Sequence, residues 1–205
     1  MTSLLYHDGN RSLQDQFDTR RLADCMEKVI LRQAFREDDR AFIEGAEFFF
    51  LATADPEGRP DCSFKGGAPG FVRVTGPDEL VFPDFDGNGM FKSLGNIRAN
   101  PNVGLLFIAM GENPRRLRVN GTATVSRDDP EMRRFVGAQL LIRVRARAIF
   151  PNCPRYIPGS EGPSEYIPRA GEAPVEPAWK GYEEFRDAVP PRASSPGSGN
   201  DKDQS

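Results

Sequence analysis

A strict alternation of apolar and polar side chains over residues 115–125 restricts what this chain can fold into. The apolar members of the segment are Leu117, Val119, Ala123 and Val125. A period of two residues places all four on one face of a β-strand, with arginines and threonines on the other face. Residues 139–150 alternate in the same way, so both segments predict long strands with one buried face.

Shorter strand patterns come before the segment 139–150, and they follow one another mainly through tight turns. The expected strands are 48–53, 61–65, 71–74, 80–84 and 103–109. Turn residues such as those at 55–58 separate them. Six or seven strands in succession predict a mainly β fold, an antiparallel β-barrel with added N-terminal helices. No GxGxxG motif supports a doubly wound sheet.

Helical patterns precede the strands, and a proline-rich segment follows them. Apolar residues recur at helical spacing over 19–35, and a second short helix is expected over 39–46. We expect a helical segment at 1–45, the barrel at 46–157, a Pro/Gly-rich extension at 158–187 and a disordered tail at 188–205. The expected anchors of the extension are Trp179, Tyr182 and Phe185.

The composition argues against several classes of function. The 205 residues, with 38% hydrophobic and 28% charged side chains, are typical of one folded domain. Their net charge of −3 argues against a nucleic-acid-binding protein, since such proteins are usually basic. No apolar run is long enough to span a membrane and the start lacks a signal-peptide pattern, so we expect a cytoplasmic protein. His7 is the only histidine, and Cys25, Cys62 and Cys153 lie far apart, so no histidine triad, metal site or disulfide framework is expected.

A glycine-containing loop leads into a short helix in the middle of the chain. Gly87 and Gly89 allow a sharp turn before a helix expected over 90–99. Lys92 and Ser93 then fall in the first helical turn, where free amide groups and the positive end of the helix dipole favour an anion. This arrangement predicts a phosphate site. The alternative is a solvated lysine on an ordinary connecting helix.

Other basic residues could reach the same anion. Lys65 ends a strand just before two glycines, which let a ligand approach the backbone, although it could also be simply a charged strand end. Arg116 and Arg118 share one face of their strand, where they could neutralise a phosphate, polarise a ring carbonyl or simply face solvent. The arginines of the last strand are expected to face solvent or an interface.

The ordered series of motifs resembles the pyridoxamine 5'-phosphate oxidase-like family of FMN-binding split barrels. A DxxGxP turn and a strand ending in lysine come first, followed by a hairpin, KSxxNIxxNP, an apolar strand and RRLRVNG. The resemblance covers residues 47–156. The runs PDCSFKGGAPGFVRV, FPDFDGNGMFKSLGNI and IFPNCPRYI are typical of a bacterial subgroup of this family whose substrate is not assigned.

The resemblance implies that FMN binds without a covalent bond between two barrels of a homodimer that acts on a small molecule. It implies that Lys65, Lys92 and Ser93 hold the phosphate, and that the backbones at 61–65 and 81–84 border the flavin. The strand that carries Arg116 and Arg118 matches a strand that reaches the flavin region in the family, in some members from the partner subunit. The full set expected to contact the cofactor is Ser63, Lys65, Pro83, Asp84, Met90, Lys92, Ser93, Arg116 and Arg118.

The chain also departs from true pyridoxamine-phosphate oxidases. Those enzymes carry an arginine where this chain has Asp61, and an arginine-lysine pair where it has Lys92 and Ser93. Their C-terminal substrate segment has no match around Trp179. Vitamin B6 oxidation is therefore not expected. No residue stands out as a catalytic acid or base, which suits a reaction that the cofactor itself carries out.

Two alternatives to an FMN-dependent oxidoreductase remain open. The barrel could bind the deazaflavin F420 and act as a reductase, or it could be a non-catalytic dimer that binds or sequesters flavin. The role of Cys153 is open as well, since it could be a small buried residue at a strand end or a thiol near the flavin. Cys62 is interpreted as structural.

Overall fold

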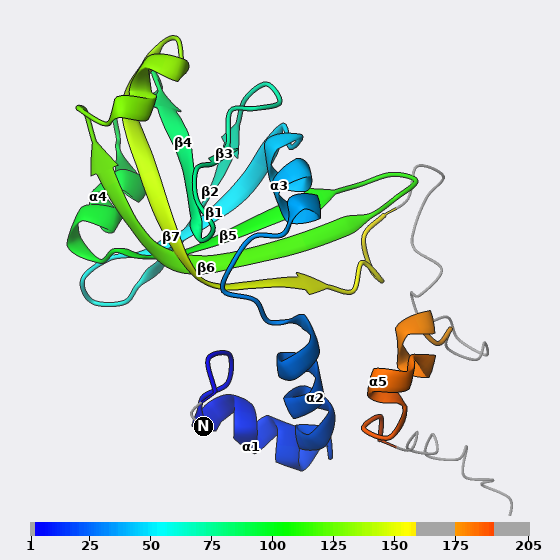
Figure 1. The fold of residues 1–205 in the computed structure, drawn as a ribbon. Helices are drawn as coiled ribbons and strands as arrows, with labels where there is room; N and C mark the ends of the chain where they lie inside the picture. The colour runs from blue at the N-terminus through cyan, green and yellow to red at the C-terminus, as the bar shows by residue number, and fades with distance from the viewer. Residues whose placement is uncertain (1–2, 159–174, 191–205) are drawn as a thin grey trace, which may run out of the picture. The chain divides into compact units, whose positions relative to one another are not determined.

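The computed structural model describes residues 3–158 and 175–190, which divide into two compact units. The larger unit begins at Ile30, ends at Pro177 and contains the β-sheet (Figure 1). The smaller unit combines the chain before residue 30 with the described residues from Ala178 onward. Most of the predicted extension at 158–187 and most of the predicted tail at 188–205 lie outside the described residues.

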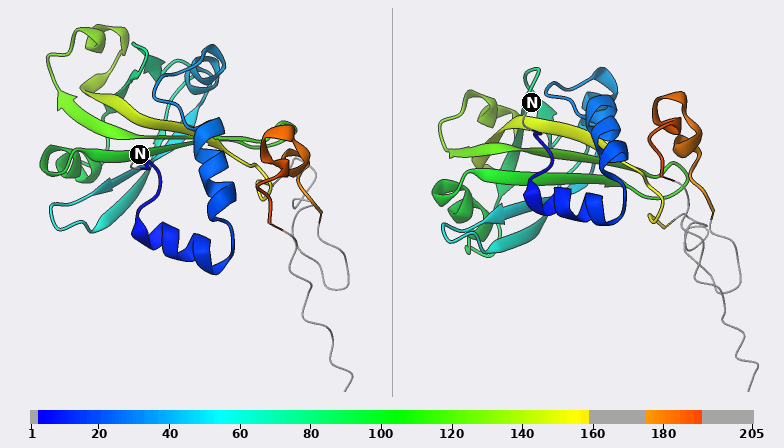
Figure 2. Two further views of the ribbon diagram at one scale, coloured as in Figure 1. Left: turned by 60° about the horizontal axis from the view of Figure 1, so that its bottom comes forward. Right: turned by 90° about the horizontal axis from the view of Figure 1, so that it is seen from below.

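The larger unit is built on one antiparallel sheet, which confirms the predicted fold class. Its strands in the described residues are β1 (Phe48–Ala54), β2 (Pro60–Gly66), β3 (Arg73–Val74), β4 (Glu79–Phe85), β5 (Asn102–Ala109), β6 (Arg115–Ser126) and β7 (Ala138–Asn152). The seven strands lie in the order β2-β1-β5-β6-β7-β4-β3. The sheet is strongly curved, as expected for the split-barrel fold (Figures 1 and 2).

The concave side of the sheet encloses an aromatic and aliphatic core. Phe49 lies at its centre, with its ring centroid 5.0 Å from that of Phe82 and 5.0 Å from that of Phe107. All three rings are fully buried. On β6 the apolar members Leu117, Val119 and Ala123 are buried while the side chains between them are more exposed, so the predicted alternation is confirmed.

A bulge interrupts the pairing of the two longest strands, β6 and β7. Their pairing register shifts between Asn120 and Gly121. A Cβ atom added at Gly121 would lie 2.0 Å from the backbone oxygen of Arg145, so only glycine fits between these strands. A bulge increases the local twist of a strand pair, which helps the sheet to curve.

Helix α4 (Lys92–Ala99) connects β4 to β5 and lies at one end of the sheet (Figure 2). Its inner face carries Leu94, Asn96 and Ile97, all of which are buried. The Asn96 side-chain amide donates to the Thr53 hydroxyl on β1 over 3.0 Å, which fixes the helix to the sheet. The helix begins at Lys92 rather than at residue 90, and it ends before Asn100 as predicted.

Helix α3 (Glu37–Glu44) belongs to the unit that contains the sheet, although the sequence placed it in a separate helical segment. Its Asp39 is fully buried and accepts from the Nη2 and Nε atoms of the Arg32 guanidinium, at 2.8 and 3.2 Å. Arg32 in turn pairs with Ile149 of β7 through the backbone. Removing one partner of such a buried ion pair typically costs about 3–5 kcal/mol of stability.

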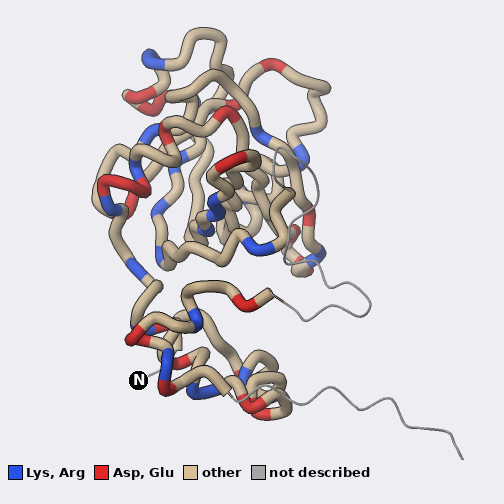
Figure 3. Tube along the Cα trace, turned by 90° about the vertical axis from the view of Figure 1, so that its right-hand side faces the viewer, with Lys and Arg blue, Asp and Glu red and all other residues tan. Residues whose placement is uncertain are grey.

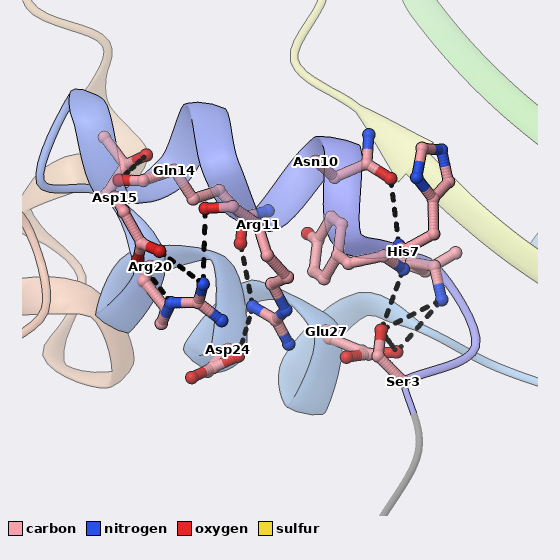
Figure 4. A network of polar contacts seen from close by, with 12 residues as sticks. Ser3, His7, Asn10, Arg11, Gln14, Asp15, Arg20, Asp24 and Glu27 are labelled. Atoms are coloured by element: carbon pink, nitrogen blue, oxygen red, sulfur yellow. Dashed lines mark hydrogen bonds and ion pairs between the residues drawn. The ribbon is translucent and has the colours of Figure 1, made fainter.

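The smaller unit contains α1 (Asp8–Gln16), α2 (Arg20–Ile30, whose last residue lies beyond the boundary), the 3-10 turn η2 (Ala178–Gly181) and α5 (Glu183–Arg186). Polar contacts hold α2 to the chain before it: Arg11 of α1 and Asp24 form an ion pair of 2.7 Å, and Glu27 accepts from the hydroxyl of Ser3, which precedes α1, at 2.9 Å (Figure 4). Trp179 packs edge-on against Phe185, which is buried.

The described residues show two further general features. None of their helices is both long and apolar enough to cross a membrane. Along the described trace, positions of Lys and Arg are interspersed with those of Asp and Glu (Figure 3).

Candidate functional site

A pocket of about 390 Å³ opens where the end of β2, the end of β4 and the start of α4 meet. The loop at residues 86–91 forms its fourth wall. Seven of the nine residues predicted to contact a cofactor line this pocket. They are Ser63, Lys65, Pro83, Asp84, Met90, Lys92 and Ser93. Strand β2 is one edge strand of the sheet, and β4 lies beside β3, the strand at the other edge. The pocket therefore lies where the sheet does not close.

The first turn of α4 faces this pocket with its amide groups uncapped by any side chain. Phe91 is the N-cap residue, and its side chain makes no capping hydrogen bond. Its φ of 47° is in the left-handed region, which is uncommon for a bulky side chain. Gly89, with a φ of 73°, turns the chain into the helix. The helix start therefore offers free N–H groups and the positive end of its dipole to an anion.

Two serines join the helix to the neighbouring strand inside the pocket. Ser93 is buried, and its hydroxyl donates to the Ser63 hydroxyl on β2 over 2.9 Å. Because side chains alternate along a strand, Ser63 and Lys65 turn to the same side of β2. Lys65 and Lys92 thus approach the same space from two different elements.

The intervening side chains of β2 turn the opposite way. Cys62 is exposed, so the interpretation of this thiol as a buried structural residue is wrong. Cys25, Cys62 and Cys153 are all free thiols, and Cys153 is half-buried. Among the described residues, no group of three or more His, Cys, Asp or Glu side chains could hold a metal ion.

Two carboxylic acids line the pocket together with the two lysines. Asp86 is exposed and accepts from the side-chain amide of Gln139 over 3.0 Å. Asp84 is half-buried, and its burial raises the pKa of its carboxyl, while the positive charge of Lys65 partly opposes this shift. Burial therefore disfavours the charged form of this carboxyl relative to that of a fully solvated one.

Arg116 and Arg118 lie outside this pocket within one chain. Arg116 donates to the backbone oxygen of Cys153, and its buried Nε atom has no partner in the described structure. Arg118 is exposed, with its guanidinium carbon 6.0 Å from the centre of the Phe150 ring. Both arginines point to the convex side of the sheet, as their position on β6 requires.

The convex side of the sheet next to the pocket is unusually apolar. We call it the outer aromatic face, and its members are Phe48, Phe50, Phe64, Leu106 and Ile108. The rings of Phe48 and Phe64 are stacked at 5.4 Å, and Phe64 is 62% exposed. The strand register places Phe64, Phe50, Leu106 and Arg118 in one row across four strands. Phe64 also lines the pocket, so this face and the pocket are continuous.

The family model for pyridoxamine 5'-phosphate oxidase matches residues 35–160, which is more than half of the chain. The chain belongs to this family. The matched residues contain the whole sheet, the pocket and the outer aromatic face. The family assignment thus confirms the resemblance inferred from the sequence motifs.

Several solved structures are similar to this family member. HupZ of Group A Streptococcus has 15% sequence identity, covers 63% of this chain and 98% of its own, and gives a TM-score of 0.46. HutZ, the heme storage protein of Vibrio cholerae, has 17% identity, coverages of 58% and 95%, and a TM-score of 0.43. An FMN-binding protein of Syntrophomonas wolfei has 11% identity, coverages of 70% and 96%, and a TM-score of 0.45. A search of curated proteins finds no match.

Some pocket residues of this family member were not predicted from the sequence. Phe91, Asp86 and Asn88 come from the loop between β4 and α4, and only their closeness to Lys92 could have indicated them. Gln139 comes from the start of β7, more than forty residues further along the chain. It reaches the pocket because β7 pairs with β4, and no local motif carries that information.

Proposed function

We propose that this chain is an FMN-binding flavoprotein in which the phosphate of FMN binds at the first turn of α4. The observation that carries the proposal is the convergence of Lys65, Lys92 and the buried Ser93 on one pocket. Ammonium groups, a hydroxyl and uncapped helix amides all donate hydrogen bonds to a phosphate, and two of them add charge. This donor set fits a phosphate monoester.

The rest of the pocket suits the ring system of a flavin. Small-molecule sites are commonly about 300–1,000 Å³ in volume, and this pocket falls within that range. Pro83 and Phe64 provide apolar surface beside it. Asp84 provides an acceptor for an N–H group on the edge of a ring. These residues would orient the ring and shield it from water.

We propose further that a second copy of the chain completes the site. The outer aromatic face is contiguous with the pocket, and exposed apolar surface of this kind is typical of protein interfaces. Arg116 and Arg118 lie on the same convex side of the sheet. In a homodimer formed through this face, the arginines of each subunit would border the pocket of the other, which accounts for their position outside the pocket of their own chain.

We propose an oxidoreductase that acts on a small molecule. FMN, when bound, supplies hydride or electron transfer, so the chain need not provide a catalytic acid or base. The residues of the chain bind the phosphate, orient the ring and leave one side open to a substrate. Because Asp61 and Lys92-Ser93 replace basic residues of the true vitamin B6 enzymes, the substrate is expected to be a different small molecule.

The phosphate site is tested with Lys92→Ala. We expect FMN to bind the parent chain and to bind the variant about 10–100-fold more weakly, because one charge-assisted contact is lost. The measurement is a titration followed by quenching of flavin fluorescence. Lys28→Ala, which removes an exposed lysine from α2, is the matched control and should bind like the parent. Failure of the parent to bind FMN would overturn the proposed function, and equal affinity of Lys92→Ala would place the phosphate elsewhere.

A titration with F420 and a reduction experiment separate the alternatives. Tight binding of F420 without binding of FMN would replace the proposed cofactor by the deazaflavin. A yellow protein that is not bleached by nicotinamide reductants would favour a flavin-sequestering dimer over an oxidoreductase with that donor.

A further inference from the structure

A second pocket, of about 490 Å³, lies beside α4 and is separate from the residues that hold the proposed phosphate. We call it the arginine groove. One wall is formed by Phe91, Leu94, Gly95 and Arg98. Leu94, Gly95 and Arg98 are spaced by one, three and four positions, so they share one face of the helix, and Phe91 is its N-cap residue. Gly95 has no side chain, and the space beside it is open within 4 Å.

The opposite wall comes from the facing ends of β6 and β7. Val125 lies at the end of β6, Arg127 directly follows that strand, and Leu140 lies at the start of β7. Leu94 and Leu140 are buried to more than nine-tenths, and Val125 is half-buried. The groove is therefore lined by apolar side chains together with two arginines that come from different parts of the chain.

The charges of the two arginines are not balanced within the described structure. Neither Arg98 nor Arg127 forms an ion pair or a hydrogen bond there. Other arginines of the same unit do: Arg134 pairs with Glu131 at 2.7 Å, and Arg143 pairs with Asp129 at 2.8 Å. Two like charges that line one groove repel each other, and an anion placed between them removes that repulsion. Guanidinium groups bind carboxylates and phosphates through paired N–H donors.

We propose that the arginine groove is a second binding site, for a small organic anion with an apolar body. Its carboxylate or phosphate group binds Arg98 and Arg127, and its apolar body covers Leu94, Val125 and Leu140. The proposal does not depend on FMN. Phe91 and Leu94 line both pockets, however, so an occupant of the groove contacts side chains that also border the proposed flavin site.

The test uses 8-anilinonaphthalene-1-sulfonate, an aromatic anion whose fluorescence rises in apolar surroundings. We expect saturable binding to the full-length protein, including after it has been saturated with FMN. Arg98→Gln and Arg127→Gln should each weaken dye binding by about tenfold or more, since each loses a charge-assisted contact. Arg147→Gln removes an exposed arginine of β7 that lines neither pocket, and it should bind the dye like the parent.

Two further measurements make the result specific. Dye binding should shift the methyl NMR signals of Val125 and Leu140, and competition with phenylacetate or phenyl phosphate should show which anionic group the site prefers. Unchanged dye affinity in both groove variants, or an equal loss in Arg147→Gln, would overturn the proposal. Retention of FMN by Arg98→Gln and Arg127→Gln keeps this result distinct from a failure of the flavin site.

Discussion

At the scale of single residues, the two carboxyls of the pocket differ in their surroundings. Asp84 is half-buried and Asp86 is exposed. Burial raises the pKa of Asp84, and Lys65 reduces this shift without cancelling it. The folded chain therefore holds the Asp84 proton to a higher pH than the unfolded chain does. The contribution of this proton to the free energy of unfolding is fully present below the pKa of the unfolded chain, about 3.9. It is lost as the pH rises through the pKa of the folded chain.

Asp84→Asn removes the charge that burial disfavours. We expect the gain in Tm of the variant over the parent to be larger at pH 7 than near pH 3, because burial penalises the charged carboxylate and the stability linked to its proton is lost as the pH rises. Circular dichroism melting curves at the two pH values measure the effect. Asp86→Asn is the matched control on the same pocket. An equal change in Tm at both pH values would contradict the assignment of the effect to this proton.

Sequence reasoning identified the pocket residues that lie close to a recognisable motif. Lys92 and Ser93 follow a glycine-containing loop, and Lys65 ends a strand, so local spacing was enough to single them out. Gln139 was missed because its place depends on which strands pair. The exposure of Cys62 was also missed, since the direction of each side chain of β2 depends on which face of this strand is covered.

At the scale of elements, the pairing of β6 with β7 depends on one glycine. Gly121→Ala would place a methyl group 2.0 Å from the backbone oxygen of Arg145, and a backbone atom cannot move aside like the end of a flexible side chain. We expect a loss of about 1–3 kcal/mol or more in the free energy of unfolding. Urea denaturation measures this loss.

Gly104→Ala on the neighbouring strand β5 is the control for that experiment. An added Cβ atom there would meet its nearest neighbours at 3.5 and 3.7 Å, which is ordinary van der Waals contact. This variant should lose clearly less stability than Gly121→Ala. Equal stability of the two variants would show that the strands separate at the bulge without cost.

The strands were more predictable than the helices before them. Alternation and turn residues located each strand to within a few positions, because one face of the sheet is buried along its length. Helix α1 was not predicted, and none of its residues is buried. His7 is its N-cap residue, and the His7 ring nitrogen accepts from the Gly9 amide, so a capping contact marks the helix start instead of an apolar stripe. Helix α2 ends at Ile30, before the predicted residue 35, because Arg32 already pairs with β7.

At the scale of the whole molecule, the outer aromatic face predicts self-association. We expect the parent chain to sediment as a dimer and Phe50→Glu to sediment as a monomer, because a buried charge opposes contact between two apolar faces. Phe50 lies on this face but does not line the pocket. Sedimentation velocity at several concentrations measures the state of association.

Phe17→Glu is the control, since Phe17 is 67% exposed in the smaller unit and lies on no part of the outer aromatic face. It should leave the dimer intact. A monomeric parent chain would contradict the proposed dimer, as would a Phe50→Glu variant that dimerises normally.

The order of the strands is the part of the architecture that the sequence did not reveal. Sequential hairpins explain β1 beside β2 and β5 beside β6, but β1 also pairs with β5 and β4 pairs with β7. Those pairings join segments that are far apart in the chain. They depend on how the whole apolar surface is best covered, which no local pattern records.

The absence of pairing between β2 and β4, where the sheet does not close, affects how the pocket could change size. Among the described strands, no backbone ladder joins β2 to β4 across the pocket. The distance between these walls is set by how tightly the strands coil, and the irregularities at Asp84/Phe85 and Asn120/Gly121 are points where that coiling is adjusted. A slight tightening or relaxation of the coil would narrow or widen the aperture for a ligand without breaking any hydrogen bond between strands.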